Sequence, residues 1–77
     1  MKADNNAILQ LMGSINELCE RSGLDPIRQL AALNALALTF QTLQQHPETS
    51  EDRLEGIVLH SIFVDLCQAG LLQGGMN

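Results

Sequence analysis

Three stretches of about twenty residues, separated by short runs that interrupt regular structure, most constrain how this chain folds. The first break is residues 23–26 (Gly-Leu-Asp-Pro) and the second is residues 46–50 (His-Pro-Glu-Thr-Ser). A third is Gly70, with a glycine pair at residues 74–75 beyond it. Glycine and proline are the strongest local interrupters of helices and strands. The chain therefore divides into three segments, each long enough to form a helix.

The first segment, residues 6–22, has the apolar spacing of an amphipathic helix. Asp4, Asn5 or Asn6 is expected to cap its start, because each offers a side-chain oxygen to free backbone N–H groups. Gly23 suits the left-handed conformation that ends many helices. The apolar side chains recur at three- and four-residue steps, as they do on one face of a helix; they are Ile8, Leu11, Met12, Ile15, Leu18 and Cys19.

The second segment, residues 26–45, is predicted to be a helix with two apolar sides. Asp25 is a good N-cap and Pro26 suits the first helical position. His46 precedes Pro47 and is therefore biased out of helical geometry. At the angular spacing of a helix, one wide face holds Leu30, Leu33, Leu36, Ala37, Phe40 and Leu43. A narrower strip on nearly the opposite side holds Ile27, Ala31 and Leu38.

The third segment, residues 50–69, is apolar over most of its circumference. Its cap is Thr49 or Ser50, and the acidic residues that follow suit the positive end of the helix dipole. Residues 57–64 are rich in β-branched side chains, which leaves a strand as the rival interpretation. We favour a helix because a single strand has nothing to pair with. The apolar residues are Leu54, Ile57, Val58, Leu59, Ile62, Phe63, Val64, Leu66 and Cys67.

These patterns predict an all-α fold, a small antiparallel bundle of three helices at about residues 6–22, 26–45 and 50–69. Residues 1–5 are expected to be disordered, residues 6–70 to form one domain, and residues 71–77 to be a flexible tail. A chain of 8.4 kDa buries only about 60% of its unfolded surface on folding. A bundle this small usually needs further support, and oligomerisation is one source of it.

The apolar surface of the second and third segments exceeds what three helices can bury among themselves. Large exposed apolar patches usually mark interfaces, and symmetric dimers are the commonest oligomers. We therefore expect a homodimer with the third helix near the two-fold axis, and a dimer or partner interface formed by Leu38, Ile57, Leu59, Ile62, Phe63, Val64 and Leu66. The alternative is a monomer with one helix wrapped by the other two. Leu59→Glu is expected to dissociate or unfold the protein, and Leu38→Glu to act more mildly.

The charge of the chain is acidic, with a net charge of −5 from nine acidic and four basic residues. The lysine and arginine residues are scattered along the chain, which argues against binding to nucleic acids or to anionic membranes. No apolar stretch is long enough to span a bilayer and no secretory pattern is present, so we expect a cytoplasmic protein with reduced cysteines. An acidic rim either steers a basic partner or is an ordinary solvated face; it comprises Glu48, Glu51, Asp52 and Glu55.

Candidate catalytic and metal-binding groups form no recognisable motif. His60 and Cys67 share a helix face but lie about 10.5 Å apart along the helix axis, too far for a nucleophile and its base. Both cysteines, Cys19 and Cys67, are expected to be small core residues. His60 is expected to lie in the core or in an interface, and a pH switch is the functional alternative. No ligand spacing typical of zinc occurs, so we expect no enzymatic activity, no cofactor and no metal.

Together these features predict a small acidic protein-interaction module of bacterial or phage type, a regulatory adaptor, an inhibitor or a chaperone-like protein. It is expected to dimerise and to dock a partner helix on apolar faces of the second and third helices. One alternative is a transcriptional regulator of helix-turn-helix type, although the third helix offers only Arg53 and Gln68 for base contacts. The other is an acidic mimic of DNA, for which nine acidic residues on a chain that is 45% hydrophobic give thin coverage.

Overall fold

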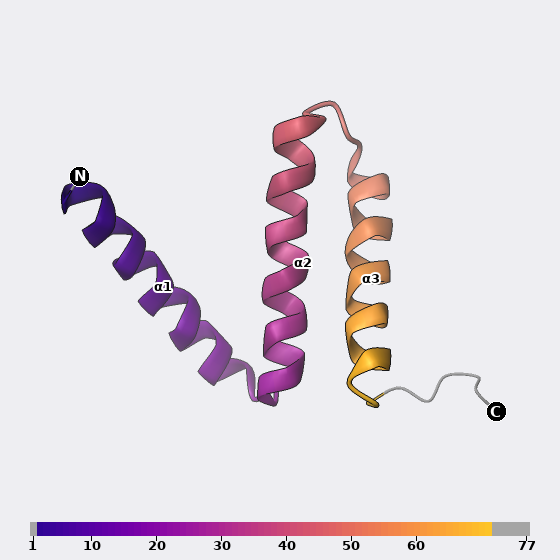
Figure 1. The fold of residues 1–77 in the computed structure, drawn as a ribbon, viewed down its shortest axis with the longest axis horizontal. Helices are drawn as coiled ribbons and strands as arrows, with labels where there is room; N and C mark the ends of the chain where they lie inside the picture. Colours follow the sequence, from indigo (N-terminus) through magenta and orange to yellow (C-terminus); the bar gives the residue numbers. More distant parts are fainter. Residues whose placement is uncertain (1, 72–77) are drawn as a thin grey trace.

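The chain is helical throughout most of its length. The computed structural model describes residues 2–71, with side chains from residue 4 onward. It contains α1 (Lys2–Ser22), α2 (Pro26–Gln45) and α3 (Glu51–Gln68) (Figure 1). The predicted all-α fold is confirmed, and the strand alternative for residues 57–64 is wrong because they lie within α3. Residues 72–77 of the expected tail lie outside the described residues.

The helix ends follow the predicted capping residues at the two corners of the chain. Asp25 and Ser50 are the N-caps of α2 and α3, and the side chain of each accepts a backbone N–H from the first turn of its helix. Gly23 and Gly70 follow α1 and α3 with φ of 75° and 79°. This left-handed conformation is strained for residues with a β-carbon, which explains why glycine stands at both places.

The start of α1 differs from the prediction. The helix begins at Lys2 rather than near Asn6, so the predicted capping residues Asp4, Asn5 and Asn6 lie inside it. The sequence places three polar residues in a row there, and polar caps and polar first-turn residues are hard to distinguish without knowing where the helix begins. The disorder expected for residues 1–5 stays a prediction.

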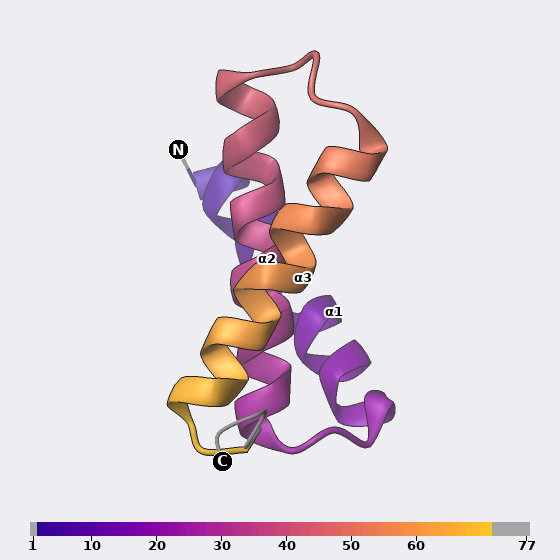
Figure 2. The ribbon, with the colours of Figure 1, turned by 90° about the vertical axis from the view of Figure 1, so that its right-hand side faces the viewer.

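The core lies between α2 and α3, which pack against each other, run in opposite directions and cross obliquely (Figures 1 and 2). Small residues form the side of α2 that meets α3. Ala31 and Ala35 are 2% and 3% exposed and are the only buried residues in the part of the chain that the structure describes. Half-buried side chains of α3 line the seam opposite them, namely Ile57, Val58, Ser61, Ile62 and Val64.

One side-chain hydrogen bond joins the two helices of this hairpin. The Asn34 amide Nδ2 donates to the Asp65 carboxylate Oδ2 over 3.3 Å. Asn34 is the single polar residue of the run from Leu30 to Leu38. Its placement at the seam gives that residue a structural role, since it pairs with an acidic group on the neighbouring helix.

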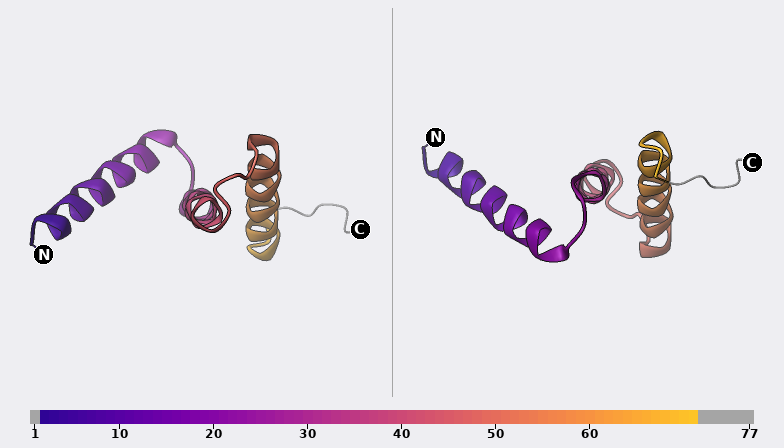
Figure 3. Two further views of the ribbon diagram at one scale, coloured as in Figure 1. Left: turned by 90° about the horizontal axis from the view of Figure 1, so that it is seen from above. Right: turned by 90° about the horizontal axis from the view of Figure 1, so that it is seen from below.

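The first helix does not pack along the hairpin. It leaves the corner at residues 23–25 and diverges from α2, so that the two helices form a V (Figures 1 and 3). Among the described residues, only α2 and α3 of the predicted bundle share a core, and α1 lies outside it.

The alanine seam gives a test of the hairpin. We expect Ala31→Leu to destabilise the protein by about 1–3 kcal/mol, because three additional carbons must fit where α3 already lies against α2. Ala7→Leu is the matched control, since Ala7 is exposed on α1 and lies outside the seam, and its effect should stay within about 0.5 kcal/mol. Urea unfolding followed by circular dichroism measures both. Equal effects would contradict the observed packing.

Candidate partner-binding surfaces

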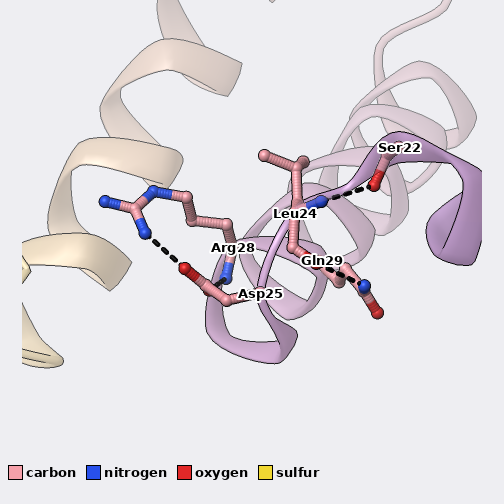
Figure 4. A network of polar contacts seen from close by, with 5 residues as sticks. All are labelled: Ser22, Leu24, Asp25, Arg28 and Gln29. Atoms are coloured by element: carbon pink, nitrogen blue, oxygen red, sulfur yellow. Dashed lines mark hydrogen bonds and ion pairs between the residues drawn. The ribbon is translucent and has the colours of Figure 1, made fainter.

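The corner between α1 and α2 is fixed by hydrogen bonds from two polar side chains (Figure 4). The Gln29 amide Nε2 donates to the carbonyl oxygen of Leu24 at 2.7 Å and to that of Cys19 at 3.3 Å. The Ser22 hydroxyl donates to the Cys19 carbonyl at 2.6 Å and accepts the Leu24 backbone N–H at 3.1 Å. These bonds tie the last turn of α1 to the first turn of α2 and set the direction in which α1 leaves the hairpin.

The cap of α2 completes this corner. The Asp25 Oδ1 accepts the Arg28 backbone N–H at 2.8 Å, and the Arg28 guanidinium forms an ion pair with the same carboxylate. The backbone hydrogen bond lowers the pKa of the Asp25 carboxyl below its ordinary value of 3.8, and the Arg28 guanidinium lowers it further. The ionised carboxylate is therefore the form that stabilises the start of α2.

This shift predicts how the corner responds to acid. Because the folded pKa of Asp25 is depressed, its charge stabilises the fold above pH 3.8, and this stabilisation is lost as the pH falls through the lower folded value. Asp25→Asn keeps a capping oxygen but does not ionise. We expect the variant to unfold at lower urea than the native chain at pH 7, and the difference to vanish in acid. A difference that persists below the folded pKa would contradict this role.

The outer side of α2, which faces away from α3, is both apolar and exposed. Its large side chains are Leu33 and Phe40, which are 36% and 60% exposed. Leu30 and Leu36 are also exposed but lie on its two flanks, where each lines a groove with α3. They belong to the wide face that the sequence marked as the richer apolar side of this helix. Of the narrow strip, Ala31 and Leu38 lie against α3 instead, whereas Ile27 is exposed. The reason is steric, since alanines allow two helices to approach more closely than leucines do.

The apolar stripe of α1 has the predicted spacing but no partner along most of its length. Ile15 and Cys19, near the corner, are half-buried. The remaining members of the stripe are exposed, and they are Ile8, Leu11, Met12 and Leu18. Most of the stability of helices in proteins comes from packing of an apolar face, so a stripe of this kind requires an apolar surface to pack on.

A cleft lies between α1 and α2 where the two helices diverge (Figure 3). Its lining from α1 includes Leu9, Met12, Ile15 and Cys19, and its lining from α2 includes Gln29 and Leu33. Gln29, Leu33 and Phe40 follow one another at steps of four and seven residues, so Phe40 lies further along the same side of α2. The lining is mostly apolar, so the cleft offers contacts to an apolar group rather than to a charged ligand.

The predicted interface residues of α3 fall on two sides of that helix. Leu59 and Phe63 lie on the outer side and are exposed. Four others are half-buried, and they are Ile57, Ile62, Val64 and Leu66. The structure therefore brings Leu59 and Phe63 together on open surface and assigns Ile57, Ile62 and Val64 to the seam with α2.

Leu38 lies in the hairpin rather than on its outer surface. It is half-buried and lines the groove between α2 and α3 together with Ile57 and Val64. The sequence pattern placed it on a surplus strip because the opposite face of α2 carries more and larger apolar residues. The core is formed by the side of α2 with the smaller side chains, and not by the side with the larger ones, because small side chains allow α3 to approach closely.

This placement reverses the expected order of two substitutions. Leu38→Glu puts a carboxylate at the seam, and we expect it to cost about 2–4 kcal/mol of stability through lost packing and desolvation. Leu59 is 59% exposed, so Leu59→Glu should leave the helix content and the urea midpoint nearly unchanged. Far-ultraviolet circular dichroism and urea unfolding separate the two outcomes. If both variants lost structure equally, Leu59 would have to make a stabilising contact that the single chain does not show.

The predicted acidic rim is open to solvent. All four of its members, Glu48, Glu51, Asp52 and Glu55, are exposed, and among residues 4–71 none of them forms an ion pair. Asp52, Glu55, Leu59 and Phe63 follow at three- and four-residue steps, so they share one side of α3. The outer side of α3 thus carries negative charge in its first turns and apolar side chains after them.

The candidate reactive groups are not brought together. Cys19 is half-buried in α1 and Cys67 is exposed on α3, and both are free thiols. The expectation that Cys67 is a core residue is therefore wrong within this chain. His60 is exposed at the groove that Leu38 lines, and it is not a core residue. Within residues 4–71, no three histidine, cysteine or acidic side chains lie together as metal ligands would.

Comparison with protein families, with curated proteins and with solved structures gives no match for this chain. Among the described helices, none combines the length and the apolar content that crossing a bilayer requires. The geometry of the surfaces is therefore the basis on which a function can be argued.

The sequence analysis assigned the interface to α3 and to Leu38 of α2, and it did not include the cleft between α1 and α2. The stripe of α1 and the wide face of α2 were both visible in the sequence as periodic apolar patterns. They were interpreted as core because a three-helix bundle would bury them. The missing information was the angle at the corner, which depends on the side-chain hydrogen bonds of Ser22 and Gln29.

Proposed function

We propose that this protein is an interaction module that associates with itself and docks another protein chain on its exposed apolar surfaces. The observation that carries the proposal is the exposure of thirteen large hydrophobic side chains, against two buried alanines. Burying one large apolar side chain contributes about 1.5–3 kcal/mol. A chain with so many of them open to solvent gains far more from binding a protein than it gains from its own core.

The outer side of α3 is the surface that we assign to a different protein. Leu59 and Phe63 offer an apolar anchor, and Asp52 and Glu55 precede them on the same side. An apolar stripe beside negative charge fits an amphipathic helix that carries lysine or arginine next to its apolar face. Charge attraction would speed the encounter and orient the partner, while the apolar contact would supply most of the affinity.

A partner of this chemistry suits a regulatory adaptor, an inhibitor or a chaperone-like protein that acts in the cytoplasm. In each of these roles the protein binds reversibly to an apolar helix of another protein. The three roles use the same surface and differ in what happens to the partner, so the binding surface is the common prediction.

The two alternatives have less support. In a helix-turn-helix the second helix carries polar side chains to the bases, whereas the outer side of α3 exposes Leu59 and Phe63. Arg53 is the single lysine or arginine within α3. A mimic of DNA needs acidic groups spread over one surface, and the outer side of α3 is apolar beyond Glu55.

The test compares partners retained by immobilised native chain with those retained by Leu59→Glu. We expect a defined protein whose affinity falls at least about tenfold in the variant, because a carboxylate then meets an apolar partner surface. Gln10→Glu is the matched control, since it adds the same charge at an exposed position on the side of α1 away from Met12. Equal retention by all three forms would refute α3 as the docking surface.

The charge contribution is measured separately. Glu55→Gln should slow association with the same partner and weaken its dependence on salt, because removing a charge at the edge of an interface acts mainly on the association rate. The dissociation rate should change little. An association rate that is insensitive to both salt and Glu55→Gln would show that the acidic rim is an ordinary solvated face.

A further inference from the structure

We propose that the cleft between α1 and α2 is the self-association site, and that α1 of a second copy of this chain occupies it. By symmetry, α1 of the first copy then occupies the same cleft in the second. This inference deepens the self-association within the proposed function and moves it from α3 to the opposite side of the hairpin. The proposed binding of another protein on α3 does not depend on this inference.

Exposure along the cleft rises steadily with distance from the corner. Gln29, at the apex, is half-buried and Leu33 is 36% exposed. Phe40, further along the same side of α2 and beyond the cleft lining, is 60% exposed. The same trend holds on α1, where Cys19 is half-buried and Met12 is 57% exposed. The chain therefore covers the apex with its own side chains and leaves the mouth open, as expected for a surface that a second helix completes.

The corner opposes closure of α1 onto its own hairpin. The connection is only residues 23–25, and Gln29 bonds the carbonyls of both Leu24 and Cys19. Swinging α1 against the mouth of the cleft requires breaking at least one of these bonds. A helix supplied by another molecule fills the cleft without changing the corner.

The amount of uncovered surface favours an occupant that is always present. Among the described residues, five large hydrophobic side chains of α1 and five of α2 are exposed. Obligate homodimer interfaces are more hydrophobic than transient ones, and this surface has that character. A partner that binds only part of the time would leave this surface exposed to water between binding events. A second copy of the chain is present whenever the protein is expressed.

The distribution of charge permits two acidic copies to meet at this place. Each copy has a net charge of −5, which opposes association over most surfaces. However, residues 29–45, which form nearly all of α2, contain no acidic and no basic residue. The α1 stripe from Ile8 to Met12 is also uncharged. The proposed contact therefore buries no like-charged pair and removes no ionised group from water.

The two helices also match in length. α1 has 21 residues and α2 has 20, so each is about 30 Å long. One α1 can thus cover the outer side of α2 from Leu33 to Phe40. Because the stripe and the outer side belong to the same chain, the contact repeats under a two-fold axis and closes the assembly at two copies.

The first test is molecular mass in solution. We expect the full chain to sediment as a dimer at micromolar concentration, and Met12→Glu to raise the dissociation constant at least about 100-fold, because the carboxylate must leave water on association. Gln10→Glu, on the opposite side of α1, and Leu59→Glu, on α3, should both remain dimeric. A native chain that is monomeric at these concentrations would overturn the proposal, as would dissociation by Leu59→Glu alone.

The second test identifies which helices touch. Phe40 and Phe63 are the only phenylalanines of the chain, which has no tyrosine and no tryptophan, so the phenyl ring protons distinguish α2 from α3. In a mixture of isotope-labelled and unlabelled native chains, filtered nuclear Overhauser spectra report contacts between copies. We expect contacts from the methyl groups of Ile8, Leu11 or Met12 to the ring of Phe40 in the other copy. Contacts confined to one copy, or contacts to Phe63 instead, would refute it.

Discussion

The close approach of α3 to the small-residue side of α2 determines what the rest of the molecule presents to solvent. Ala31 and Ala35 permit that approach, and once the seam is formed, the leucines and Phe40 on the other side of α2 are left outside it. The hairpin is therefore held by a narrow contact, and the greater apolar capacity of α2 stays available. Two features follow from it, namely a chain with a very small core of its own and a wide uncharged surface next to α1.

Much of the fold could be predicted from the sequence, because the helix ends depend on local chemistry. Asp25-Pro26, Ser50, Gly23 and Gly70 mark their corners through hydrogen-bonding and conformational preferences that act within a few residues. The start of α1 was predicted too late because several polar residues in succession offer equally good caps. Local rules fix the positions of helices, but they do not fix which side of a two-sided helix faces its neighbour.

The candidate surfaces were predicted less well for the same reason. The apolar surplus of α2 and α3 was evident from helical spacing, and Leu59 and Phe63 do lie on open surface. Leu38 was assigned to the outer surface because the opposite face of α2 has more bulk, although close helix packing selects for less. The cleft beside α1 was not predicted, since its existence depends on long-range geometry set by the side chains of Ser22 and Gln29.

The short corner before α2 also makes α1 a lever. A helix of 21 residues extends about 30 Å from its pivot, so a rotation of about 10° at Gly23 displaces the far end by about 5 Å. That displacement is comparable to the width of a side chain. A single substitution at Ser22, Gly23 or Leu24 would thus change the distance between α1 and α2 without altering the apolar surface of either helix. Sequence change at this corner is therefore a simple way to change which helix fits between them.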